Sequence, residues 1–374
     1  METIDSQAET AGLDTASWTP FLTLGSLREW EARKKRWTIF QLLEGFRYVD
    51  STLKRDRFFA LLGIASDGHL EGFEPDYVSP LEAVIRKFAK ALVDHLAPRG
   101  EAIKVLYRAG LSSQPDRFPS WVPDWTTEKP SSLYDPLDRS DDAHDASDGR
   151  PEHIQCNSED ELSVKGYIID TVRHVSTWAN GPQSHQSYFS EIDKMIDVHC
   201  PSHSGKGASG LEWKVPIAGT RHPEIAVSTH TDLYASYQAF RRLITEPQHD
   251  TEEHQRATGD EPSPGAPVAT STSQDAQTTS VDASFQYVSL LNDKVLGWRF
   301  LITEKKTMCG IAPENVQSGD MVAIFCGGAV PFVVRKSETV PGAYRLVGEC
   351  YIHENMRGEA LEDAGVVETM IRLH

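Results

Sequence analysis

The chain is 374 residues long, with 39% hydrophobic residues and a formal net charge of -18. An acidic surface of this kind repels nucleic acid and anionic lipid, so we expect protein partners and no nucleic-acid or membrane partner. The longest apolar run, Met321 to Val334, is too short to cross a bilayer. Five scattered cysteines indicate free thiols in a reducing compartment, so a cytoplasmic location is expected.

The first third of the chain predicts a helical region behind a disordered start. Residues 1–17 are polar and poor in large apolar side chains, which is typical of disorder. The region 18–125 then carries amphipathic patterns at Leu27 to Val49 and at Leu81 to Leu96, with a short helix expected at Asp56 to Leu62. An N-terminal helical layer is therefore predicted.

Two short motifs in this region make local predictions. Ser79-Pro80-Leu81-Glu82 has the form of a capping box with proline at the first helical position. The region ends in Pro119-Ser-Trp-Val-Pro-Asp-Trp125, where the prolines favour an extended backbone and the even spacing would place both tryptophans on one side. We expect the two indole rings to anchor this segment as a packing clamp.

The rest of the chain predicts a linker followed by a β module with a long insertion. Residues 126–155 are rich in Ser, Asp, Pro and Gly and form the linker, and the module spans 156–374. An insertion at about 184–245 has two amphipathic helical patterns. Residues 246–282 are of low complexity, so we expect limited proteolysis to cut first there or in the linker.

Sheet-forming patterns lie on both sides of that insertion. Residues 161–175 alternate apolar and polar side chains and are interrupted at Gly166, which predicts a strand or a bent strand pair. Five further runs are short, β-branched or aromatic, and separated by glycine-containing turns: Arg299–Thr303, Met308–Ile311, Asp320–Phe325, Val330–Arg335 and Ala343–Ile352. The sequence predicts an α+β fold whose C-terminal antiparallel sheet is barrel-like and pairs with 162–175 across the insertion.

Several of these segments resemble fungal heterokaryon-incompatibility (HET) proteins in the region that follows the HET domain. The resemblance is carried by Arg55 to Ala65, Pro75-Asp-Tyr77, Pro119 to Trp125, Ser318 to Arg335 and Tyr344 to Leu361. It implies a role in nonself recognition, in which such proteins trigger growth arrest or programmed cell death when incompatible cells fuse.

One part of the family pattern is missing. The HET domain, held responsible for the toxic output and similar to TIR domains, has a Trp-Ile-Asp-x-x-Cys-Ile-Asn-Gln type motif that this sequence lacks. The resemblance therefore implies a noncatalytic accessory or regulatory region that does not cleave NAD by itself. Such a chain is either a natural short paralogue or a truncated gene model.

Motifs for ligands and metals are weak. Gly205 to Gly210 fits G-x-G-x-x-G, but no strand precedes it and Pro216 disfavours a long helix after it, so a loop is expected. Three Cys/His pairs share a two-residue gap: His153 with Cys156, Cys200 with His203, and Cys350 with His353. Because the first two pairs lie in polar segments and the third alternates across a strand, no metal or cofactor is expected.

The alternative to a noncatalytic module is a Cys-dependent hydrolase. Cys326 precedes Gly327-Gly328, where backbone amides could converge on an oxyanion, and His174 or His353 could act as its base. The spacing equally predicts that the two glycines form a hairpin turn between strands, which is the favoured interpretation. The basic run Arg33 to Arg36 is interpreted as a solvated helix face. No catalytic, cofactor-binding or metal-binding residue is assigned.

Overall fold

The structure is a computed structural model that describes residues 37–47, 49, 51–111, 117–127, 132–134, 144–177, 182–201, 210–219, 230–245, 283–291 and 297–374. Several sequence predictions lie outside these residues. They are the disordered start at 1–17, the basic run at 33–36, most of the glycine motif before Gly210, and the low-complexity segment at 246–282. Residues 128–131 and 135–143 of the linker also fall outside them.

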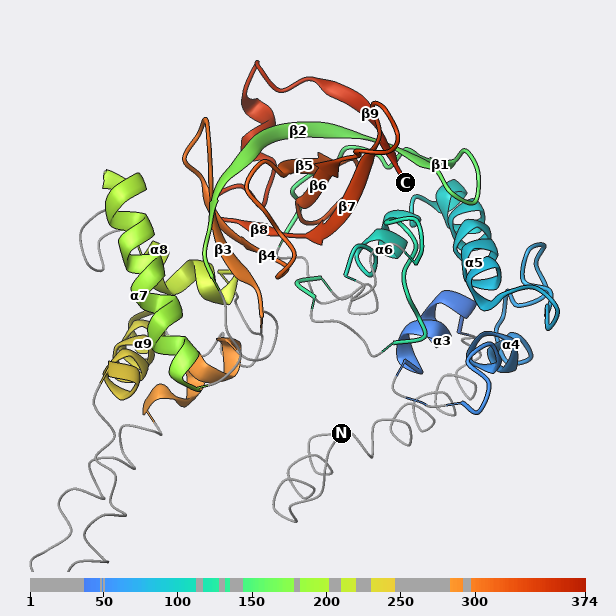
Figure 1. The fold of residues 1–374 in the computed structure, drawn as a ribbon, viewed down its shortest axis with the longest axis horizontal. Coiled ribbons are helices and arrows are strands. Elements are labelled where there is room, and N and C mark those ends of the chain that lie inside the picture. Colours follow the sequence, from blue (N-terminus) through green and yellow to red (C-terminus); the bar gives the residue numbers. More distant parts are fainter. Residues whose placement is uncertain are drawn as a thin grey trace, which may run out of the picture.

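The N-terminal helices form a layer on one side of the molecule (Figure 1). Their bounds are α3 Ile39–Gly45, α4 Asp56–Leu62, α5 Leu81–Leu96 and α6 Ile103–Leu106, with a 3-10 turn, η1, at Ala97–Arg99. Helix α5 buries one apolar face that includes Ile85, Phe88 and Leu92. This helical layer confirms the prediction, and its last helix, α6, is a single turn.

The predicted capping box at Ser79 is wrong. Helix α5 begins at Leu81 with Pro80 as its N-cap, and no side chain caps it. The amide of Ser79 instead donates to the Asp76 carboxylate at 2.9 Å, and Glu82 binds Arg117 at 3.0 Å. A capping box is present at α3, where Thr38 and Gln41 each bind the other's backbone.

The C-terminal part is a β-barrel built around one long strand, β2 Leu162–Val175 (Figure 1). The other strands are β1 Ile154–Cys156, β3 Arg299–Thr303, β4 Cys309–Ala312, β5 Met321–Phe325, β6 Phe332–Lys336, β7 Tyr344–Glu349, β8 Tyr351–Ile352 and β9 Glu368–Leu373. β2 pairs with β5 and β9, and β6 and β7 link these two, so the ring closes. β2 continues onto β3, β4 and β8.

These pairings confirm that 162–175 joins the later strands across the insertion. The strand is not interrupted at Gly166, however: it runs through this residue, and its register shifts between Ile168 and Asp170 and again between Val172 and His174. A Cβ at Gly166 would lie 2.5 Å from the carbonyl oxygen of Ile324. Glycine therefore permits close approach of β5, and the bends lie at the bulges beyond it.

The last strand of the sheet differs from the prediction in two ways. β9 is a strand that the sequence patterns did not indicate, because half of its residues are exposed and its apolar alternation is short. It also meets β7 in parallel, through Tyr344 and Leu373, so the sheet is mixed rather than purely antiparallel. The remaining pairings are antiparallel.

Strand alternation divides the buried side chains between two clusters. Val322 and Ile324 of β5 belong to a small cluster that also holds Val333 of β6, Leu301 of β3 and Cys350, so it lies within the barrel between β5, β6 and the β3 side. The alternate residues of β5 point the other way, into a larger, outer cluster that includes the helical layer. This is the period-2 pattern of a strand buried on both faces.

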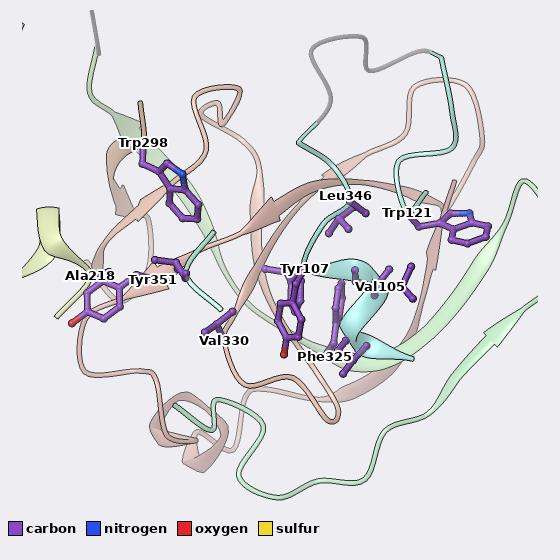
Figure 2. Packing of buried hydrophobic residues seen from close by; sticks show 14 of the residues in the cluster. Val105, Tyr107, Trp121, Ala218, Trp298, Phe325, Val330, Leu346 and Tyr351 are labelled. Atoms are coloured by element: carbon purple, nitrogen blue, oxygen red, sulfur yellow. The ribbon is translucent and has the colours of Figure 1, made fainter. Parts of the chain in front are cut away.

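The outer cluster joins the barrel to the elements on both of its flanks. Figure 2 shows Val105 and Tyr107 of the α6 region packed near Phe325, with Trp298, Tyr351 and Ala218 in another part of the cluster. The insertion contributes α7 Pro182–His199, α8 Leu211–Lys214, the 3-10 turn η3 Val215–Ile217 and α9 His230–Thr245, and a further helix spans 283–291. Figure 1 places α7 and α9 beside β3, on the opposite flank from α3 to α5.

No helix within the described residues is both long and apolar enough to span a bilayer.

Candidate functional site

The segment 117–127 joins the helical layer to the barrel. The backbone amide and hydroxyl of Ser120 both donate to the carbonyl oxygen of His374, at 3.0 and 2.5 Å, and the same hydroxyl accepts from the amide of Leu346 in β7 at 2.8 Å. The segment is a series of turns rather than the extended strand that its prolines suggested. One serine thus ties this segment to two places in the barrel module.

The two tryptophans of the predicted clamp are both fully buried. The Trp125 ring packs edge-on against Phe58 of α4 at 6.2 Å between centroids, and its Nε1 donates to Glu44 at 3.0 Å. Trp121 lies in the same large cluster, in the part drawn with Val105 and Leu346 (Figure 2). The indole rings are anchors, as expected from the sequence.

A buried ionic cluster forms under Trp125. The Glu44 carboxylate accepts from Nε of Arg108 at 2.8 Å, and Nη2 of Arg47 donates to the backbone oxygen of Asp124 at 2.9 Å. The side chains of Glu44, Arg47 and Arg108 are at most 1% exposed. Charges at such depth need partners, and here α3, α6 and the 117–127 segment supply them to each other.

Glu349 adds a carboxyl at the end of β7, close to this cluster. Its Oε1 accepts from the amide of Leu133, and burial raises the pKa of Glu349 to about 7, although the nearby Arg108 opposes this shift. Next to it, the Tyr107 hydroxyl accepts from the amide of Ala329 at 2.7 Å. Burial also raises the Tyr107 pKa, so this phenol stays protonated and serves as a packing and hydrogen-bonding group.

Sequence reasoning missed this ionic cluster. Glu44 stands in an amphipathic pattern where a charged residue is normally assigned to the solvent face, and Arg108 follows a one-turn helix. The available signal was that Glu44 directly follows the apolar pair Leu42 and Leu43, both buried, near the end of a short helix. The pattern indicates burial for such a position, but it does not identify the partner.

A cleft of about 510 Å³ opens on the other flank, between the end of β2 and α7. Its lining comprises Arg173, His174, Val175, Glu191, Met195, Arg299, Gln317 and Ser318. Several of its polar groups are engaged within the protein: Arg299 donates to the carbonyl oxygen of Ser176, and Glu191 accepts from the amide of Thr177 at 2.9 Å. The cleft is open, and several of its polar groups already bind partners within the protein. It therefore suits contact with another molecule better than general acid-base catalysis.

His174 lies at this cleft, where its ring stacks on that of His199 at 3.8 Å between centroids. Burial, His199 and Arg173 lower the pKa of His174. The other histidine considered as a base, His353, accepts or donates a hydrogen bond with the Tyr351 hydroxyl at 2.9 Å. Each histidine ring therefore contacts a neighbouring side chain, His199 in the case of His174 and Tyr351 in the case of His353.

Cys326 occupies a hairpin turn, as the glycine pattern predicted. The amide of Gly328 donates to the Phe325 oxygen at 2.9 Å, and Gly327 has a φ of 81° that favours glycine. The amide of Cys326 itself donates to the Lys165 oxygen at 2.9 Å, so these amides do not converge on an oxyanion. The residue is 1% exposed and burial raises the pKa of its thiol, which disfavours a nucleophile.

The described residues contain no group of three or more His, Cys, Asp or Glu side chains placed to hold a metal ion. Cys350 is fully buried in the smaller cluster, and His353, which follows it at the two-residue gap noted in the sequence, forms a hydrogen bond with Tyr351. Cys156 is half-buried in β1, and His203 lies outside the described residues, as does most of the Gly205 to Gly210 motif.

Comparison with known proteins adds two findings. A family model described as the Het-6 beta-barrel domain matches residues 160–368, more than half of the chain. The chain is also 24% identical over 355 residues to "Heterokaryon incompatibility protein 6, OR allele" of Neurospora crassa, with 84% of this chain and 50% of the relative covered. It thus spans about half the length of that relative. No solved structure matches the chain.

Proposed function

This chain belongs to the Het-6 β-barrel family, and from that premise we propose that it is a noncatalytic regulatory region that acts in fungal nonself recognition by binding another protein. The relative in Neurospora crassa is named for heterokaryon incompatibility, and the alignment includes most of this chain. The match over 160–368 contains strands β2 to β8 together with the insertion, so the proposal assigns the binding role to this module.

The proposal rests on one observation: the buried charged groups bind partners within the protein and so hold its elements together. Glu44 and Arg108 bind each other, and Asp170, which is 4% exposed, accepts from the amides of Thr171 and Lys306. Asp320, 2% exposed, binds the Arg335 guanidinium at 2.7 and 2.9 Å. These groups orient helices, loops and strands, whereas catalysis needs titratable groups that converge on a substrate.

The proposed partner is a complete relative that carries the same barrel. Like domains often associate symmetrically, so a barrel supplied on a separate chain can occupy the surface that two complete relatives use to contact each other. The cytoplasm is the proposed compartment, because all five cysteines are free thiols and such thiols persist under reducing conditions.

Co-expression in a fungal host tests this function. The chain is induced alone and together with a complete relative that causes growth arrest, and hyphal growth is measured. We expect normal growth with the chain alone and a changed degree of arrest in combination. The matched control is Val322→Asp, which places a charge inside the barrel and should unfold it. Arrest by the chain alone, or equal effects of wild type and Val322→Asp in combination, would refute the proposal.

A further inference from the structure

Two cysteines meet where the insertion contacts the barrel. Cys200 is the residue after α7, and its amide still bonds to the Ile196 oxygen at 2.8 Å, so the helix geometry fixes its position. Cys309 is the first residue of β4. Cys200 is 2% exposed and Cys309 is 4% exposed. The two residues come from segments 109 positions apart in the sequence.

The two sulfur atoms lie 3.4 Å apart and share a hydrogen bond. All five cysteines fall within the described part of the chain, and no other pair among them lies within hydrogen-bond distance. A disulfide needs a sulfur separation of about 2.05 Å, so the thiols must approach by only about 1.4 Å. This pair is therefore the one set of thiols that is close enough to be joined by a small movement.

Neighbouring contacts hold the pair in place. His174, Ile302 and Cys309 are in register across β2, β3 and β4, so their side chains project from the same face of the sheet. The end of α7 lies on this row, because His199 stacks on His174 at 3.8 Å while the adjacent Cys200 contacts Cys309. Two consecutive residues thus fix the helix end to two strands.

The geometry points to an oxidation site: we propose that hydrogen peroxide converts Cys200 and Cys309 into a disulfide that fastens the insertion to the barrel. The hydrogen bond with Cys309 lowers the pKa of Cys200, which favours Cys200 as the attacking sulfur. This inference is independent of the proposed function, because it concerns the covalent state of the chain itself.

The chemistry balances in two steps. The Cys200 thiolate attacks one peroxide oxygen, and the O–O bond breaks. Hydroxide departs as the leaving group, and Cys200 becomes a sulfenic acid. The Cys309 thiol then loses its proton and attacks the Cys200 sulfur; the S–O bond breaks and water leaves. Overall, two thiols are oxidised and one peroxide is reduced to two waters. Peroxide is the class of oxidant that fits, because a buried pair admits a small molecule more readily than a bulky disulfide.

Thiol counting after mild oxidation tests the proposal. The purified, reduced chain is treated with limiting peroxide, then denatured, and its free thiols are titrated and its peptides mapped by mass spectrometry. We expect the count to fall from five to three, with one cross-linked peptide that joins Cys200 to Cys309, and dithiothreitol should restore five. Five remaining thiols, or thiol loss without this cross-linked peptide, would overturn the proposal.

Variants give matched controls. Cys309→Ser has four thiols and should form no intramolecular cross-link, whereas Cys156→Ser also has four and should fall to two. Cys156 is the suitable control because it is more exposed, although burial raises its pKa to about 12. If either variant fails to fold, the presence or absence of the Cys200–Cys309 cross-linked peptide in the wild-type chain still tests the proposal. An intramolecular cross-link that persists in Cys309→Ser would also overturn the proposal.

Discussion

Glu349 is a fully buried carboxyl whose ionisation should affect stability at alkaline pH. Its pKa in the folded chain is about 7, against a usual value of 4.5, mainly because burial disfavours the charge. The folded pKa is above the unfolded one, so the stability associated with the protonated group is complete below about pH 4.5 and is lost as pH rises through about 7. At pH 8 the loss amounts to about 3 kcal/mol, taking about 1.4 kcal/mol for each pKa unit.

We therefore predict that Glu349→Gln stabilises the chain at pH 8 and has little effect at pH 5. The amide keeps the shape of the side chain and an oxygen that can accept from the Leu133 amide, but it carries no charge. Denaturant unfolding at both pH values measures the difference in the free energy of unfolding. A variant that is less stable than wild type at pH 8 would show that the carboxylate is needed for packing.

The ion pair of Glu44 and Arg108 makes a second prediction. Arg108→Met removes one partner and leaves a buried carboxylate, which should cost about 3 to 5 kcal/mol of unfolding free energy. The control is Lys87→Ala, because the Lys87 and Glu74 side chains pair at 2.9 Å on the surface, where solvent screening leaves such pairs little effect on stability. Equal melting temperatures of the two variants would contradict the buried-pair interpretation.

At the scale of elements, the clamp joins the helical layer to the barrel. Trp121 is fully buried in the shared cluster, and truncation of a large aromatic side chain in a core costs about 3 to 5 kcal/mol. Trp121→Ala should therefore lower the melting temperature and the soluble yield together. Loss of partner binding with an unchanged melting temperature would instead identify Trp121 as an interaction residue.

Sequence patterns predicted most elements, because their signals are local. The run at 299–303 matches β3 residue for residue, and the glycines after Cys326 mark the turn between β5 and β6. Closure of the ring by β9 was missed, because it depends on pairing with β2 some 200 residues away rather than on a pattern in 368–373 itself. The strand at 343–352 was predicted as continuous but divides at Cys350 into β7 and β8, which pair with different strands.

The candidate site was harder to predict than the fold. Whether Glu44 and Arg108 meet depends on how α3 and α6 pack, and neither helix pattern contains that information. The contact of Cys200 with Cys309 likewise follows from how the insertion folds back onto β4. The prediction that Cys326 belongs to a turn succeeded because two adjacent glycines between strands restrict the local geometry strongly.

At the scale of the whole molecule, one continuous apolar cluster connects the N-terminal helices, the outer face of the barrel and the insertion. The barrel interior holds a separate, smaller cluster. A change in side-chain packing at either flank can therefore alter the packing on the outer face of the barrel. This arrangement supports the proposed role, in which the chain acts by presenting a fixed surface to a partner rather than by catalysing a reaction.

The most direct test of that account compares two cysteine variants in the co-expression experiment. Cys326→Ala removes the thiol of the alternative hydrolase, and Cys156→Ala is the matched control at a position with no proposed catalytic role. Hyphal growth beside a complete relative is measured after equal accumulation of the two variants and wild type is verified. We predict that both variants change the arrest to the same degree as wild type. If folded Cys326→Ala loses the effect while Cys156→Ala keeps it, the noncatalytic account is contradicted and the Cys326 thiol acts in a reaction.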